Sequence, residues 1–437
     1  MMLDKLKIIV CLTACILLGS SNSFAQVPDD SFGRGKGIVT LGECIRQGIS
    51  SNHDLKILES KISIRRQEKW VLQSQNLPSL SLDVQSENFI DITAEYVDTN
   101  KAVLKLEQML YDGGKTKYSV RRASKEIDIA DFEYQVGRQN LIYMVKRAYA
   151  EAQRNAEKMK IARNKMGKWK QLYRNLKRRV AMGTATVIEA KRVRNHFMRM
   201  RKEYADFARS FSSWRSTIAV LTTMDARQIS CLEPLVEYNI DLKTLDNYIQ
   251  LAMARRQEIM ESESRVASRS DSVRIAQAAN LPDLRIAGEP GFISTGSDED
   301  LKFNPTVGIR FTLFYDLYNW GRTKSMITAA QIEREISRTE LDKTRLVVMS
   351  EIVDTYEQTV QSQRLLEATR TYVSVAKSAV RDAYDLFMEG RYSVRDLIDV
   401  EMECEEAELS YIDSITEMDI MKARLYRAVA YDEALIS

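Results

Sequence analysis

The stretch "YDGGKTK" at residues 111–117 recurs in altered form as "YNWGRTK" at residues 318–324, and the two begin 207 residues apart. The Gly-Lys-Thr triplet resembles the end of a phosphate-binding loop. Such a loop needs a glycine five positions before Gly114, where backbone amides surround the phosphate, but this position is Met109. The stretch therefore does not predict nucleotide binding, and its recurrence needs another explanation.

The two halves of the chain match beyond these stretches. Asn76-Leu77-Pro78 corresponds to Asn280-Leu281-Pro282 at an offset of 204 residues, and Gly114 corresponds to Gly321 at an offset of 207. Matches at a nearly fixed offset indicate a duplicated unit, with one insertion of three residues between the two sets. We predict repeat 1 at 41–221, a linker at 222–243, repeat 2 at 244–430 and a C-terminal tail at 431–437.

The N-terminus has the features of an export signal. Lys5 and Lys7 precede the apolar run Ile8–Leu18, and Ser23-Phe24-Ala25 places small residues around a cleavage site. We therefore predict a signal peptide at 1–25, followed by an N-terminal periplasmic segment at 26–40. No later apolar run approaches the ~20 residues that a transmembrane helix needs.

The cysteines raise two questions. Leu12–Cys15 resembles a lipobox, but the apolar residues directly after Cys15 argue against lipidation, and the sequence leaves this point open. Cleavage after Ala25 leaves Cys44, Cys231 and Cys404, an odd number spread over the chain. We expect no disulfide framework and three small buried side chains.

Composition excludes several classes of function. The net charge of the 437 residues is only +3, which does not favour a nucleic-acid partner, and the export signal makes RNA binding improbable. The chain has only two histidines, His53 and His196, without a metal-spaced cluster or a nucleophile motif. We expect neither an enzyme nor a bound metal or cofactor.

The distribution of proline predicts long helices. None of the six prolines lies in 79–233 or 306–437. A helix from about Gly114 to Gly183 would be about 100 Å long, with shorter helices at about 42–76 and 185–221 on either side. Apolar residues step along it by three, four or seven positions, a spacing typical of helices that pack lengthwise: Ile127, Ala130, Tyr134, Leu141, Val145, Ala148 and Ala152.

Before each long helix the apolar pattern changes to a period of two. Leu80, Leu82 and Val84 alternate with polar residues, which predicts a β-hairpin at 78–113 with one apolar face, and repeat 2 has a similar hairpin at 282–320. Four such strands leave open edges, which are costly in a bilayer. If they span a membrane, two copies would supply eight strands and three copies twelve. A soluble α+β fold, with the hairpins packed on the helices, is the alternative.

This order of elements, twice over, resembles the TolC-like outer-membrane efflux proteins across nearly the whole mature chain. "LGECIRQGISSNHDLKILES" (41–60) is similar to that family's opening helix, and "FMEGRYSVRDLIDVEMECEEAELSYID" (387–413) to its second periplasmic tip. The resemblance implies a mostly α-helical protein that contributes to a transmembrane β-barrel. It implies a homotrimer, with a twelve-strand barrel in outer-membrane lipid and a twelve-helix periplasmic tunnel.

The resemblance also implies a function. Such proteins export small molecules or proteins by docking to an inner-membrane pump through a periplasmic adaptor (membrane fusion) protein. The chain departs from the family at Met109 and Phe314, where a proline is common, and at Tyr392, where some members carry an arginine that latches the pore. The substrate, the pump and the adaptor cannot be identified from the sequence.

The order of strands and helices also predicts the positions of the turns. Gly114 and Gly321 mark the barrel-to-helix turns, and Gly183 and Gly390 mark the periplasmic tips. Basic residues beside the first pair of glycines would lie at headgroup depth, and these are Lys115, Lys117, Arg322 and Lys324.

Carboxylates near the second tip are candidates for a pore gate. Asp396 and Asp399 lie three residues apart, hence on one helix face, and in the family such aspartates line the narrowest part of the tunnel. Threefold symmetry would form rings of carboxylates that bind cations. Glu189 occupies the matching place in the first tip, and Arg391 and Arg395 are candidate latching partners. A solvated acidic helix face is the alternative.

The two tips also differ in charge. Residues 157–202 contain sixteen Lys or Arg and two acidic residues, whereas 389–419 contain two basic and eleven acidic residues. Neighbouring helix pairs would therefore attract each other, and adaptor docking is a competing use of both surfaces. A periplasmic, adaptor-like helical scaffold without a barrel remains the alternative function.

Overall fold

The computed structural model describes residues 38–431 except 91–95, 230, 238–240 and 297–303. The predicted signal peptide (1–25), Cys15 and most of the segment 26–40 lie outside the described residues. So do the C-terminal tail after Tyr431 and parts of both hairpin loops.

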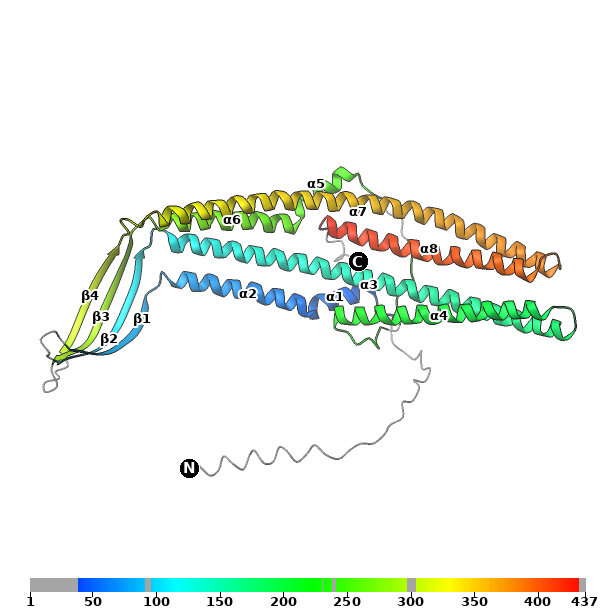
Figure 1. The fold of residues 1–437 in the computed structure, drawn as a ribbon, viewed down its shortest axis with the longest axis horizontal. Helices are drawn as coiled ribbons and strands as arrows, with labels where there is room; N and C mark the ends of the chain where they lie inside the picture. Colours follow the sequence, from blue (N-terminus) through cyan, green and yellow to red (C-terminus); the bar gives the residue numbers. More distant parts are fainter. Residues whose placement is uncertain (1–37, 91–95, 230, 238–240, 297–303, 432–437) are drawn as a thin grey trace, which may run out of the picture. The chain divides into compact units, whose positions relative to one another are not determined.

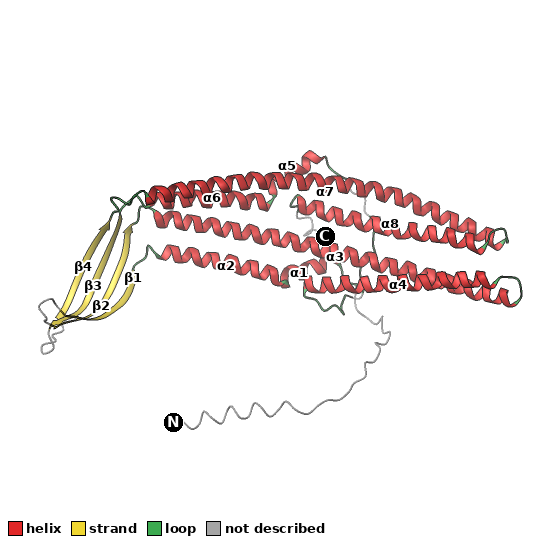
Figure 2. Ribbon diagram, in the orientation of Figure 1, coloured by secondary structure: helices red, strands yellow, loops and turns green. Residues whose placement is uncertain are grey.

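The described unit contains the same series of elements twice (Figures 1 and 2). Repeat 1 consists of α1 (Leu41–Ser51), α2 (His53–Ser74), β1 (Ser79–Ile90), β2 (Tyr96–Tyr111), α3 (Lys115–Ala181) and α4 (Val187–Thr222). Repeat 2 consists of α5 (Leu245–Arg255), α6 (Gln257–Ala278), β3 (Asp283–Gly296), β4 (Asn304–Phe314), α7 (Arg322–Met388) and α8 (Val394–Ala428).

The long helices α3 and α7 organise the packing. Each has 67 residues, which corresponds to about 100 Å. α3 contacts α2, α4, α6 and α8, and α7 contacts α5, α6 and α8. The predicted seam of α3 is largely buried, with Val145 and Ala152 fully enclosed. Among the helices of the described ranges, none has a stretch apolar and long enough to cross a membrane.

The short helices before each hairpin are interrupted, although the sequence predicted one helix over about 42–76. Asn52 separates α1 from α2; its side chain accepts hydrogen bonds from Asp54 N and Leu55 N and donates one to Leu221 O (3.1 Å). In repeat 2, Arg256 separates α5 from α6 and donates to Ala428 O (2.7 Å). Two different residues at equivalent positions thus bind the end of the last helix of their repeat.

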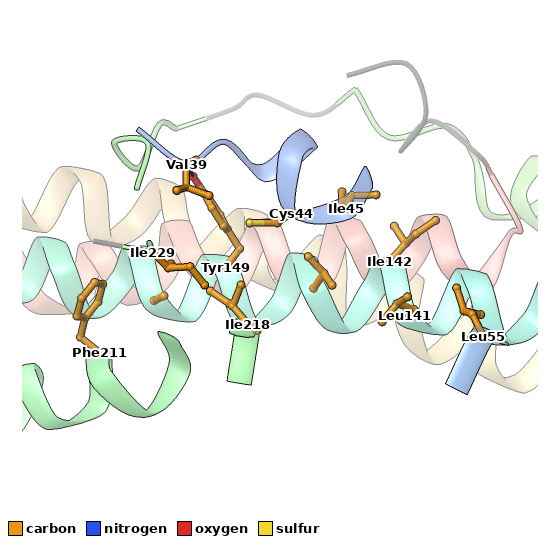
Figure 3. Packing of buried hydrophobic residues seen from close by; sticks show 13 residues of the cluster. Val39, Cys44, Ile45, Leu55, Leu141, Ile142, Tyr149, Phe211, Ile218 and Ile229 are labelled. Carbon is orange, nitrogen blue, oxygen red and sulfur yellow. Dashed lines mark hydrogen bonds between the residues drawn. The ribbon is translucent and has the colours of Figure 1, made fainter. Parts of the chain in front are cut away.

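The largest core lies where α1, α3 and α4 meet the linker (Figure 3). Tyr149 of α3 is buried there, and its hydroxyl donates to Val39 O (2.8 Å) and accepts from Glu233 N (3.0 Å). Cys44 belongs to this core, and Cys404 is also buried. Cys231 is exposed, so the expectation of three buried cysteines was wrong for one of them, because the linker runs over the surface at that residue.

The four strands form one antiparallel sheet in the order β1-β2-β3-β4. Apolar residues from all four strands occupy one face and are exposed, as for Leu82 (68%), Leu104 (47%) and Ile309 (70%). The other face carries ion pairs between strands, among them Lys101 with Glu289 (3.6 Å) and Arg285 with Glu107 (3.5 Å). The alternation predicted from the sequence therefore produces one apolar and one charged surface.

Gly291 permits a close approach of two strands. It pairs with Val103 across β2 and β3. A Cβ atom at this position would lie 2.4 Å from the carbonyl oxygen of Ala102 and 2.6 Å from Val103 Cα. Because these are backbone atoms, a rotamer change cannot relieve the clash.

We expect Gly291→Ala to destabilise the protein by about 1–3 kcal/mol, because β2 and β3 must move apart to admit the methyl group. The thermal unfolding midpoint of the detergent-extracted variant measures this effect. Gly288→Ala is the matched control, since a Cβ at Gly288 would have no atom within 4 Å. Equal midpoints for the two variants would contradict the prediction.

Candidate functional site at the helix tips

The turns at both ends of the long helices depend on glycine in the left-handed region. Gly114 and Gly321 are the N-cap residues of α3 and α7, with φ of 85° and 80°. At the other ends, Gly183 and Gly390 have φ of 74° and 77°. Other residues rarely adopt these angles without strain.

The two tips share one backbone geometry. Thr184 N donates to Arg179 O (2.9 Å) and Gly183 N to Val180 O (3.0 Å), and Arg391 and Gly390 make the equivalent bonds at the second tip. This pattern is the Schellman motif, which satisfies the last carbonyl groups of a helix. Each long helix therefore ends in a defined turn.

Two of the candidate gate carboxylates cap the helices that follow the tips. Glu189 accepts a hydrogen bond from Thr186 N (2.8 Å) while its own N–H donates to Thr186 Oγ1 (3.3 Å). Asp396 forms the same capping box with Ser393, whose hydroxyl and N–H both donate to Asp396 Oδ2 (2.6 and 3.2 Å). These bonds, the hydroxyl first, lower the pKa of Asp396.

This capping role is not among the predictions from the sequence, although its signal is present there. "TVIE" at 186–189 and "SVRD" at 393–396 place a hydroxyl residue three positions before an acidic one, which is the capping-box pattern. Glu189 and Asp396 therefore stabilise the first turns of α4 and α8, respectively.

The candidate latch arginines lie beside carboxylates of their own tip. Arg395 is 3.8 Å from Asp399, one turn further along α8, and both side chains are exposed. Arg391 is 3.5 Å from Glu389. Neither arginine has an ion pair with Asp396 among the described contacts.

Charged residues further from the tips join the two helix pairs through contacts that no sequence pattern predicts. Lys165 of α3 contacts Glu401 (2.8 Å) and Glu408 (3.5 Å) of α8. All three side chains are largely buried. Burial by itself lowers the pKa of Lys165, but the hydrogen bond to Glu401 and the two carboxylate charges raise it on balance.

A second contact joins α4 to α8 at the buried carboxylate of Glu405. Glu405 accepts a hydrogen bond from Arg199 Nη2 (3.1 Å), and His196 Nε2 lies 3.7 Å from the same carboxylate oxygen. Burial, with the charge of Glu203, raises the pKa of Glu405 to about 7. Burial, with the charges of Arg199 and Lys165, lowers the pKa of His196 to about 4.

His196 is therefore neutral near pH 7. Its ring and that of Trp169 pack in a T-shaped arrangement with a centroid distance of 4.2 Å. Two of the charges and the histidine belong to the basic segment 157–202, and their partners belong to the acidic segment 389–419. The opposite charges of these two segments thus attract each other within one chain. No group of three or more His, Cys, Asp or Glu in the described ranges is arranged to bind a metal ion.

We expect Glu405→Gln to stabilise the fold increasingly as the pH rises from 5 to 8. The folded state binds this proton more tightly than the unfolded chain, so the contribution of Glu405 is complete below pH 4.5 and is lost as the pH rises through about 7. The full shift corresponds to about 3 kcal/mol. Glutamine carries no charge to bury, so the difference in melting temperature should grow with pH.

The control for this measurement is Glu406→Gln, because Glu406 is the exposed neighbour on α8. Its melting temperature should follow that of the wild-type protein at each pH. His196 is present in all three proteins, so its own titration cancels in the differences. Parallel curves for Glu405→Gln and the wild type would contradict the assignment.

Comparison with known proteins agrees with this architecture. The sequence model of the family described as outer membrane efflux protein matches residues 44–222 and 248–430, one segment on each repeat. The probable outer membrane lipoprotein SilC of Salmonella typhimurium is 19% identical over 399 residues, covering 89% of this chain and 85% of that protein.

Solved structures share the fold. The outer membrane protein VceC of Vibrio cholerae has a TM-score of 0.75 at 17% identity, covering 89% of this chain and 95% of that chain. The CmeC outer membrane channel of Campylobacter jejuni has a TM-score of 0.76 at 16% identity, covering 95% of this chain and 93% of that chain. Since the family's model matches both repeats over most of their length, the chain belongs to the outer membrane efflux protein family.

Proposed function

We propose that the protein is the outer-membrane exit duct of a tripartite efflux or type I secretion system. It would carry substrates from an inner-membrane pump across the periplasm and the outer membrane. The observation that carries this proposal is the sheet, whose apolar face is exposed while its other face carries ion pairs. Such a sheet suits lipid on one side and a water-filled channel on the other.

The duct would be a homotrimer. β1 and β4 are the edges of the sheet and have no further strand beside them in the described ranges. An unpaired backbone group in a bilayer costs several kcal/mol, so the edges must be covered by further copies. Three copies would supply a barrel of twelve strands, continued by a tunnel of twelve helices, which is the assembly that the family resemblance implies.

The partners would be a periplasmic adaptor protein and the pump that it connects to the duct. The tips, which lie at the opposite ends of α3 and α7 from the sheet (Figure 1), are the surfaces available for docking. The role would be passive conduction, without catalysis, cofactor or nucleic acid. Opening would rotate helix pairs against each other, which requires the contacts of Lys165 and Arg199 with α8 to change.

Electron microscopy of the full-length protein extracted from outer membranes tests this function. We expect hollow, threefold particles with a helical shaft of about 100 Å. Compact particles, or a protein that is released without detergent, would contradict the duct and favour a periplasmic helical scaffold.

The pore gate is tested by Asp396→Asn combined with Asp399→Asn. In a trimer this change would remove two rings of three carboxylates, so we expect divalent cations to block the channel several-fold less strongly and cation selectivity to fall. Asparagine can still accept the capping bonds that Ser393 donates to residue 396, which separates gating from helix capping.

Conductance of single channels in planar bilayers is the measurement. Asp342→Asn serves as the control, because Asp342 is an exposed acidic residue of α7 far from the tip. Unchanged divalent block in the double variant would remove the two aspartates from the gate. Equal loss in the control would assign the effect to overall charge.

A further inference from the structure

His196 and Glu405 form a buried pair between the two helix pairs of the chain. His196 lies on α4 and Glu405 on α8, and their side chains are only 5% and 6% exposed. His196 Nε2 lies 3.7 Å from Glu405 Oε2. This nitrogen is buried and has no hydrogen-bond partner among the described residues. Water therefore solvates a charge on either side chain poorly while α4 and α8 are packed.

Arg199 and Glu203 are the charged neighbours of this pair on α4. Arg199 Nη2 donates a hydrogen bond to Glu405 Oε2 (3.1 Å), and Arg199 Nε lies 3.5 Å from Glu203. The side chain of Arg199 is 40% exposed and that of Glu203 is 31% exposed, so water screens both charges. Arg199 therefore compensates the buried carboxylate only in part. The pKa of Glu405, which burial raises to about 7, agrees with this geometry.

Lys165 is the charged neighbour on α3, and carboxylates other than Glu405 bind its ammonium group. Lys165 contacts Glu401 (2.8 Å) and Glu408 (3.5 Å) of α8, and Lys377 of α7 also contacts Glu408 (3.4 Å). Lys165 therefore acts on the buried pair as a nearby positive charge. Burial first, and then the charges of Arg199 and Lys165, lower the pKa of His196 to about 4.

The packed pair holds one proton over about two pH units. Between about pH 4.5 and 6.5 the proton is on the carboxyl of Glu405, and the imidazole of His196 is neutral. The ordinary pKa is 4.5 for glutamate and 6.5 for histidine. A pair exposed to water therefore also holds one proton in this range, but on the imidazole. The number of bound protons is the same in both arrangements, whereas their position differs.

We propose that Glu405 passes one proton to His196 when the two helix pairs separate. In the packed state the carboxyl is protonated and the imidazole is neutral. In the separated state, which water reaches, the carboxyl has lost its proton and the imidazole has gained one. The exchange takes no proton from the periplasm and releases none, so the opening of the duct does not depend on pH in this range. This inference rests on the proposed function, in which opening rotates the helix pairs against each other.

Either residue alone would make opening depend on pH, and the two effects have opposite signs. Glu405 binds its proton more tightly when packed, so by itself it would favour the packed state as the pH falls from about 7 to 4.5. His196 binds its proton more tightly when exposed, so by itself it would favour separation as the pH falls from 6.5 to about 4. Over the common range the two effects cancel.

Conductance of single channels in planar bilayers at about pH 5 and about pH 6.5 tests the exchange. In His196→Gln only the carboxyl of the pair titrates, so we expect the ratio of open to closed channels to rise at least about tenfold with pH. In Glu405→Gln only the imidazole titrates, so the ratio should fall by a similar factor. The wild-type protein should follow the double variant His196→Gln/Glu405→Gln within about twofold.

Comparison with the double variant removes the titration of all other carboxylates, which the four proteins share. Glu406→Gln is the matched control, because Glu406 is the exposed neighbour on α8, and its ratio should follow that of the wild type at both pH values. The same pH dependence in all four proteins, or the same sign in both single variants, would overturn the exchange and leave the duct standing. A wild-type protein that forms no channel would contradict the duct itself.

Nuclear magnetic resonance of protein with ¹³C-labelled imidazole rings locates the proton in the packed state without any channel activity. His53→Gln leaves His196 as the only histidine of the chain. The resonance of His196 should remain that of the neutral ring down to about pH 5. An imidazole that titrates near pH 6.5 in the detergent-extracted protein would overturn the exchange, because His196 would then carry the proton in both states.

Discussion

Two open edges on a four-stranded sheet are the constraint on which the rest of the molecule depends. β1 and β4 have no neighbour in the described ranges, and the apolar face of the sheet is exposed. Both features are costly, because backbone groups at the edges lack partners and the apolar surface is contiguous. In the proposed duct, further copies of the chain would cover both the edges of the sheet and its exposed backbone groups.

Duplication explains how a chain with such edges was built. The contact that repeat 1 makes with repeat 2 is already complete within the chain, through α3 on α6 and β2 on β3. Equivalent positions have since diverged while keeping their role, as Asn52 and Arg256 show by binding the ends of α4 and α8. Gly113 and Trp320, which also occupy equivalent positions, differ in their surroundings. Gly113 packs against repeat 2 of its own chain, whereas Trp320 is exposed.

Charged residues near the tips make two kinds of contact. Lys165 and Arg199 contact buried carboxylates of α8 and join the helix pairs of one chain, Lys165 being itself buried and Arg199 partly exposed. Such pairs add little net stability after desolvation, but breaking one leaves a buried charge unpaired. They therefore favour one arrangement of the helix pairs over others. Asp399 and Arg395, by contrast, form an ion pair whose side chains are both exposed to solvent.

The sequence by itself determined the duplication, the long helices, the alternating strands and the family, because periodicity and proline placement act locally and repeat at a fixed offset. It also located the glycines at the turns. It did not separate α1 from α2, place Cys231 on the surface, or pair Lys165 with Glu401, which lies 236 residues away. Only the tertiary structure decided these features, since they depend on which distant side chains meet. The capping bonds between Asp396 and Ser393 are a different case, because they join residues three positions apart and their pattern is present in the sequence.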